Sequence, residues 1–129
     1  MNNLDKESII GISALLVHAA NIDEIYSNHE KELIKNFIDS YLKDGNTNEI
    51  LKKAEEIEKN SNQLLNYTNI IKQKSMDIKK DIVEHLWKVI ISDNSVDQYE
   101  ANLMRRICGL IYFPDKESGE IKLRLLNSK

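Results

Sequence analysis

The sequence contains few of the residues that break helices or cross-link a chain. Its 129 residues include one cysteine, one proline and four glycines. Because Cys108 is the single cysteine, neither an intrachain disulfide nor a metal site built from several thiolates can form, which fits a reducing compartment. Proline and glycine are the strongest helix breakers, so their scarcity favours a mostly helical chain.

The chain also lacks a large excess of charge of one sign and any long apolar run. Its formal net charge of -3 at pH 7 provides no broad attraction to nucleic acid or to an anionic bilayer. No apolar stretch approaches the length of about 18 residues that a membrane-spanning helix needs, and no basic segment precedes an apolar one at the N-terminus. We therefore expect a cytoplasmic protein that neither binds nucleic acid nor inserts into a membrane.

Apolar residues recur at helical spacing along most of the chain, and no alternating strand pattern of useful length appears. Hydrophobic residues make up 41% of the sequence and charged residues 30%, which is a globular composition. We therefore predict an all-α fold, a compact bundle of about six to seven helices in a single domain over residues 1–129. The predicted helices cover about residues 5–21, a stretch through 34–42, 48–59, a less regular segment over 64–74, 75–92, a stretch through 103–111, and a short terminal helix containing 121–125.

Several local predictions follow from the apolar and charged patterns. The helix over about 5–21 should have one buried face, and the clean stripe from Val83 to Ile91 suggests that the helix over 75–92 is the central one. Thr47 should act as an N-cap, with Ile57 facing inward from the helix it starts. The basic stretch around Lys79 and Lys80 should form a solvated helix face.

The sequence repeats itself with an offset of 70 residues and no gap. Leu16 and Val17 fall on Leu86 and Trp87, and the offset continues through the segments that follow. We therefore predict two related helix-loop-helix units, over about 8–43 and 78–113, that pack around one core. Apolar residues occupy all six predicted inward positions of the second helix in both units: Leu33, Ile34, Phe37, Ile38, Tyr41 and Leu42 match Leu103, Met104, Ile107, Cys108, Ile111 and Tyr112.

An Asp opens each predicted loop, and a Glu follows it by seven residues. Asp23 and Glu30 in the first unit match Asp93 and Glu100 in the second. If the two helix pairs bring their loops to one end, the four carboxylates could bind a hard cation such as Ca²⁺, Mg²⁺ or Mn²⁺. An alternative is purely structural, because Glu30 and Glu100 each stand three residues after a residue that can act as an N-cap, as in a capping box.

These segments resemble the tellurite-resistance TerB family, in particular its bacterial single-domain TerB-like branch, from about Ile10 to Leu126. The segments that carry the resemblance run from Leu15 through Asp23 to Glu30, and from Leu86 through Asp93, Tyr99 and Glu100 to Arg105-Arg106-Ile107 and Gly109-Leu110. Family members usually have Ala-Asp-Gly where this chain has Ile22-Asp23-Glu24 and Ser92-Asp93-Asn94. The resemblance implies a non-enzymatic domain with an acidic, metal-binding cluster and a role in tellurite resistance or metal stress.

Other patterns that could carry chemistry are weak. The spacing of Asp93, Ser95 and Asp97 is that of the first ligands in a calcium loop, but Gln98 and Met104 replace the required Gly and Glu, so it is not an EF-hand. His18, His29 and His85 form no metal-binding motif, and Cys108 lies on an apolar face without a neighbouring His, as a packing thiol does. No nucleophile or phosphate-binding motif accompanies them. We expect neither an enzyme nor an organic cofactor.

The sequence thus supports one leading function and two alternatives. The leading prediction is a non-enzymatic TerB-like module that binds a divalent cation through loop carboxylates. The first alternative is a protein-interaction or scaffold module without metal, which exposed apolar residues near the loops would favour. The second is a small enzyme that uses paired carboxylates as general acid and base, which would require a deep pocket.

Overall fold

Helices account for nearly all of the described chain. The structure is a computed structural model, and it describes residues 4–21, 27–42, 45–60, 64–91 and 98–127. The described residues form seven helices and no strand, which confirms the predicted all-α fold. In chain order the helices are α1 (Lys6–Ala20), α2 (Asn28–Tyr41), α3 (Thr47–Asn60), α4 (Leu64–Lys72), α5 (Met76–Ile91), α6 (Gln98–Leu110) and α7 (Asp115–Asn127).

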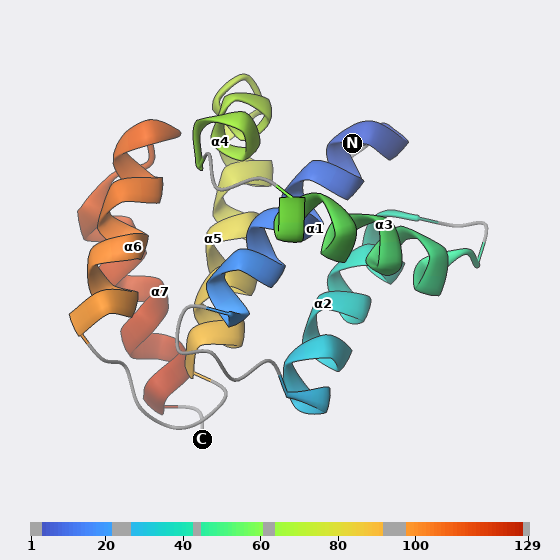
Figure 1. Cartoon of the computed structure of the whole chain (residues 1–129). Coiled ribbons are helices and arrows are strands. Elements are labelled where there is room, and N and C mark those ends of the chain that lie inside the picture. The colour runs from blue at the N-terminus through green and yellow to red at the C-terminus, as the bar shows by residue number, and fades with distance from the viewer. Residues whose placement is uncertain (1–3, 22–26, 43–44, 61–63, 92–97, 128–129) are drawn as a thin grey trace.

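The helices are arranged around α1 and α5. Figure 1 shows α6 and α7 on one side of this pair and α2 and α3 on the other, with α4 above. Helix α1 packs against α2, α3, α4 and α5, and helix α5 packs against α1, α2, α6 and α7. None of the described helices combines the length and the apolar character needed to cross a membrane.

Helix α1 begins and ends where its sequence predicts. The carboxylate of Asp5 accepts the backbone N–H of Ser8 at 2.8 Å, and the N–H of Asn21 closes the last turn on the carbonyl of Val17 at 2.9 Å. The prediction of one buried face was wrong, however. Buried residues surround the whole helix, from Ser8 to Ala20, so α1 is more enclosed than α5, which we expected to be central.

The helix bounds follow the repeat. Adding 70 to the first residues of α1 and α2, Lys6 and Asn28, gives Met76 and Gln98, which are the first residues of α5 and α6. The two first helices also begin alike, since the Ser75 hydroxyl accepts the backbone N–H of Ile78 at 3.3 Å, as Asp5 does for Ser8 in α1.

The structure extends this correspondence to a third helix. Helix α3 packs on α1 and α2, and helix α7 packs on α5 and α6 in the same way. Leu51 of α3 and Ile121 of α7 are both buried, and they are 70 residues apart. Each half is therefore a three-helix unit, which we call the first unit (α1–α3) and the second unit (α5–α7), and α4 connects them by packing on α1 and α6.

Two predictions for α3 were wrong. The carbonyl of Asn46 accepts the N–H of Ile50 at 3.1 Å, so the capping position is one residue earlier than expected, and Thr47 already belongs to the helix. The Thr47 hydroxyl instead donates to the carboxylate of Asp39. Ile57, expected to face inward, is 41% exposed, because Ile50, Leu51 and Ala54 make the buried face of this helix.

Lys79 also departs from its prediction. It is only 7% exposed, although the sequence predicted a solvated face there. Its counterpart in the first unit is Ile9, which is fully buried. The long apolar stem of a lysine can fill the space of an isoleucine while the ammonium group reaches toward water, and this explains why the position tolerates a charged residue.

The C-terminal end of α6 explains why Tyr112 does not face inward. The N–H of Phe113 donates to the carbonyl of Cys108 at 2.9 Å, and the N–H of Tyr112 donates to the carbonyl of Gly109 at 3.4 Å. These two hydrogen bonds form a Schellman motif. The motif places Tyr112 in the left-handed region, with φ of 61°. Its side chain is 65% exposed, whereas Phe113 is buried beside the helix end.

Candidate functional site

Glu30 caps the helix in which it lies. The Ser27 hydroxyl accepts the backbone N–H of Glu30 at 3.1 Å, and the Glu30 carboxylate accepts the N–H of Ser27 at 2.8 Å. These reciprocal bonds form the capping box that the sequence predicts at the start of α2. Glu30 is nevertheless 8% exposed, which is low for an acidic residue in a first turn.

Glu100 takes the equivalent place in the second unit. It lies in the first turn of α6 and is 4% exposed. Asp97, its expected capping partner, lies outside the described residues. Two acidic residues 70 positions apart are thus both buried at the starts of matching helices.

Asp23 and Asp93, the other two predicted ligands, also lie outside the described residues. The helix ends that adjoin them can be located: the C-terminal ends of α1 and α5 and the N-terminal ends of α2 and α6 all lie toward the lower side of Figure 1. Within the described segments, no group of three or more His, Cys, Asp and Glu residues could hold a metal ion. The four-carboxylate site remains a prediction, because half of its members fall outside those segments.

His18, near the C-terminal end of α1, pairs with Glu58. Nδ1 of His18 lies 3.4 Å from a carboxylate oxygen of Glu58, and the side-chain amide of Asn21 donates to the other oxygen at 3.0 Å. Glu58 belongs to α3, so these contacts tie the third helix of the first unit to the end of α1. His29, by contrast, is exposed at the start of α2.

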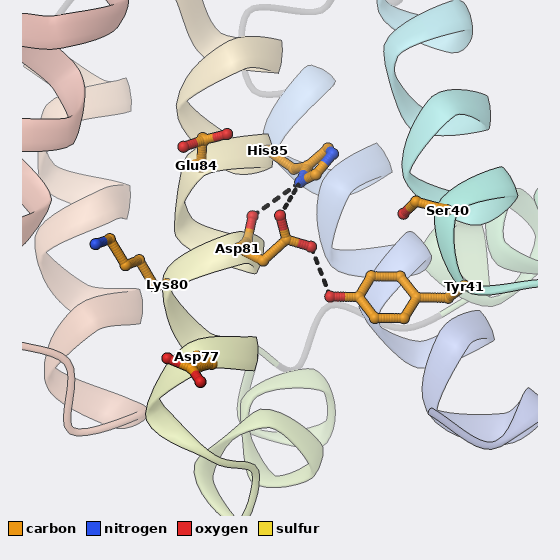
Figure 2. A pocket seen from close by; sticks show the side chains of 7 residues that line it. All are labelled: Ser40, Tyr41, Asp77, Lys80, Asp81, Glu84 and His85. Atoms are coloured by element: carbon orange, nitrogen blue, oxygen red, sulfur yellow. Dashed lines mark hydrogen bonds and ion pairs between the residues drawn. The ribbon is translucent and has the colours of Figure 1, made fainter. Parts of the chain in front are cut away.

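A pocket of about 410 Å³ opens between the C-terminal end of α2 and one face of α5. Figure 2 shows Asp81 between Tyr41 and His85, while Lys80 points away from them. The Tyr41 hydroxyl donates to Asp81 Oδ2 at 2.6 Å, and Nδ1 of His85 lies 2.8 Å from the backbone carbonyl of Asp81 and 3.5 Å from its Oδ1. Burial, followed by the hydrogen bond and the negative charge of Asp81, raises the pKa of Tyr41.

This arrangement links two helices and orients polar groups toward the pocket. Asp77, Asp81 and Glu84 line the same face of α5. Glu84 is paired with Lys88 at 3.5 Å and with Arg124 of α7. The sequence shows the i, i+4 spacing of Asp81 and His85 but gives no signal that joins them to Tyr41, forty residues earlier.

Cys108 is a packing residue, as predicted. It is 1% exposed in α6. Burial raises the pKa of its thiol, with Asp115 adding to the effect and a hydrogen bond from Ser118 opposing it. A buried thiol that stays protonated is a poor nucleophile.

The fold and the first turns of α2 and α6 together define the class of protein. It is an all-α protein of two related helical units, and each unit has a buried glutamate in the first turn of its second helix. A family model described as tellurite resistance protein TerB matches residues 10–123. The match spans most of the chain, so the chain belongs to the TerB family and the predicted resemblance is confirmed. Comparisons with curated proteins and with solved structures give no match.

Proposed function

We propose that this chain is a non-catalytic, cytoplasmic TerB-like module that binds a divalent cation, Ca²⁺, Mg²⁺ or Mn²⁺, through Asp23, Glu30, Asp93 and Glu100. Its role would belong to a bacterial response to tellurite or other toxic metals, and the family description names tellurite resistance. Carboxylate oxygens are the ligands that these hard cations prefer.

The observation that carries the proposal is the burial of Glu30 and Glu100 at matching positions. Buried carboxylates are normally held by hydrogen bonds or ion pairs, and both Glu30 and Glu100 have such interactions. Capping accounts for one bond of Glu30, but a carboxylate has two oxygens with several lone pairs, so capping and ligation are compatible. The adjoining helix ends, which lie on the same side of the molecule, allow the two loops to contribute to one site.

The test is titration calorimetry of chelator-stripped protein with Ca²⁺, Mg²⁺ and Mn²⁺. We expect saturable binding that both Asp23→Asn and Asp93→Asn remove, because a shared site needs ligands from both loops. Asp77→Asn is the matched control, since this exposed acid lies at the opposite end of α5 and should leave binding unchanged. Binding retained in both loop variants would overturn the proposed site.

A second pair of variants separates the cap from the ligand. Glu30→Gln keeps a capping box, because Gln also serves at that position, but it removes a charged ligand and should weaken cation binding. Ser27→Ala does the opposite: it removes the cap, lowers the free energy of unfolding by about 1 kcal/mol, and should leave the cation affinity close to that of the unaltered chain. Urea unfolding and calorimetry on both variants distinguish the two roles.

The alternative function is a protein-interaction module without metal. It is favoured by large apolar side chains left exposed on the third helix of each unit, Ile57 at 41% and Leu123 at 59%. If none of the three cations produces heat or shifts the melting temperature at millimolar concentration, this alternative replaces the cation-binding proposal.

A further inference from the structure

A second, smaller pocket lies within the second unit. It encloses about 230 Å³ between α5, α6 and α7. Trp87 of α5 and Met104 of α6, both buried, line it on the apolar side. On the α7 side the wall is the backbone at Gly119, where an added Cβ would meet no atom within 4 Å. The space therefore continues up to the helix itself.

The tryptophan in this wall is fixed in position. Its indole Nε1–H donates to the Ser118 hydroxyl at 2.9 Å, and the ammonium of Lys122 lies 5.4 Å from the ring centroid. Trp87 is only 4% exposed and lines the pocket. A rigid aromatic ring with a cation beside it is suited to contact with a flat, negatively charged molecule.

Basic side chains outnumber acidic ones around this pocket. Arg105 and Lys122 line it against a single carboxylate, Asp115. Arg105 is exposed and has no ion-pair partner in the part of the chain that the structure describes. A guanidinium group without a partner can bind a carboxylate through two parallel hydrogen bonds.

The first unit has a pocket at the equivalent place, which indicates that the three-helix unit itself builds this space. That pocket lies between α1, α2 and α3 and has a volume of about 420 Å³. Lining residues from the first, second and third helices correspond with the 70-residue offset: Val17 and Trp87, Lys31 and Ala101, and Lys52 and Lys122.

The two pockets differ in charge. Three glutamates, Glu55, Glu56 and Glu58, line the pocket of the first unit together with three lysines. Leu125 and Leu126 replace the first two glutamates in the second unit. The pocket of the second unit therefore has no glutamate at these two positions, and two basic side chains against one acidic side chain line it.

We propose that the pocket formed by Trp87, Met104, Arg105, Gly119 and Lys122 binds a small aromatic carboxylate. Its volume is below the range of roughly 300 to 1,000 Å³ typical of sites for drug-sized ligands, so it fits a one-ring molecule and is too small for a nucleotide. The ring contacts Trp87 and Met104, and the carboxylate binds Arg105 and Lys122. This site shares no residue with the proposed cation site.

The chain contains one tryptophan, so a single indole N–H signal in a ¹⁵N–¹H spectrum reports on this pocket. We would titrate the labelled full chain with benzoate at constant ionic strength and follow the Trp87 signal. Benzamide has the same shape without the charge, and acetate has the charge without the ring. We expect a saturable shift with benzoate and about tenfold weaker binding of benzamide, the factor that one charge-assisted hydrogen bond supplies. Acetate should also bind more weakly than benzoate, because it lacks the apolar contacts of the ring.

Substitutions locate the site. Arg105→Gln should weaken benzoate binding about tenfold. Arg106→Gln should not, because Arg106 is also exposed but does not line the pocket. Asp115→Asn should strengthen binding, because it removes the carboxylate that repels the ligand. Gly119→Leu should abolish binding by filling the space, while the added side chain meets no clash at its Cβ and leucine is the better helix former.

Three outcomes would overturn the proposal. One is the absence of a saturable Trp87 shift with benzoate at tens of millimolar. Another is equal binding of benzamide and benzoate, which would show that the cations do not select the ligand. The third is undiminished binding in a folded Gly119→Leu variant, which would place the ligand elsewhere.

Discussion

Tyr41 shows how one side chain joins two helices that are distant in sequence. Its hydroxyl bonds Asp81 of α5, and its ring packs against Phe37, with the ring centroids 5.1 Å apart. Phe37 in turn makes an edge contact with His85 at the same centroid distance. The end of α2 is thus held to α5 by one hydrogen bond and by aromatic packing.

The raised pKa of Tyr41 predicts a specific pH dependence. Because the folded state favours the neutral phenol, this group's contribution to stability is fully present below the ordinary tyrosine pKa of 10.0 and is lost as the pH rises through the higher pKa of the folded state. Tyr41→Phe should lower the free energy of unfolding at pH 7 by about 1 kcal/mol and reduce the decline of that free energy above about pH 10. Urea unfolding at several pH values measures both effects.

Tyr112→Phe is the matched control for this prediction. Tyr112 is 65% exposed and its hydroxyl makes no hydrogen bond among the described residues, so its removal should change neither the stability nor the pH profile. An identical profile for both variants would show that the bond to Asp81 has no role in the alkaline loss of stability.

At single positions, sequence reasoning succeeded where the interaction is local. The Ser27–Glu30 capping box was predictable because its partners are three residues apart and their types are diagnostic. The burial of Lys79 was not, because charge dominates the pattern around it and the packing of its stem depends on other helices. The hydrogen bond from Tyr41 to Asp81 was not predicted for the same reason, because it depends on how α2 and α5 pack together.

Helices were predicted well where their ends carry clear signals. The bounds of α1 and α5 lie within one or two residues of the sequence prediction, because Asp5 and Ser75 cap their starts. The third helix of the repeat was not recognised. Helices α3 and α7 share the buried pair Leu51 and Ile121, but most of their other residues differ in charge, so the sequence offset alone did not show that they correspond.

Two glycines that lie inside helices allow a matched pair of stability predictions for single helices. At Gly109 of α6 an added Cβ meets nothing within 4 Å, so Gly109→Ala should raise the free energy of unfolding by about 1 kcal/mol through helix propensity. At Gly11 of α1 the Cβ would lie 2.4 Å from Cδ1 of Ile70 in α4. Because Cδ1 is the far end of a half-buried side chain that can shift, Gly11→Ala should be less stable than Gly109→Ala by about 1 kcal/mol, the low end of the cost of overpacking.

Urea unfolding of the two variants gives the comparison directly. A gain for Gly11→Ala equal to that for Gly109→Ala would mean that Ile70 moves aside freely and that α1 and α4 are not tightly packed. The sign of the difference, more than its size, tests how closely these two helices approach.

Across the whole molecule, contacts between the two units predict one cooperative transition. Helices α1 and α2 of the first unit both pack on α5 of the second, and the buried apolar residues of both units form one cluster. Trp87 fluorescence, which reports on the second unit, should therefore unfold with the same midpoint as the far-ultraviolet circular dichroism, which reports on all helices. Two separate midpoints would contradict the predicted single domain.

Equivalent core substitutions sharpen this test. Leu51→Ala in α3 and Ile121→Ala in α7 each remove a buried side chain and should lower the free energy of unfolding by about 2 to 5 kcal/mol. In a single domain, either substitution shifts the fluorescence and dichroism midpoints together. A Leu51→Ala shift seen by dichroism but not by Trp87 would show that the units unfold separately.

The enclosure of α1 also has a consequence for the order of events during synthesis. This helix leaves the ribosome long before α5, yet one of its buried sides is covered only when α5 has emerged and packed against it. Until then an apolar surface stays in contact with water, and the contacts that cover it span many residues of chain, which slows folding. The most buried helix of the finished protein is thus the segment whose nascent form is most exposed to chaperones and to aggregation.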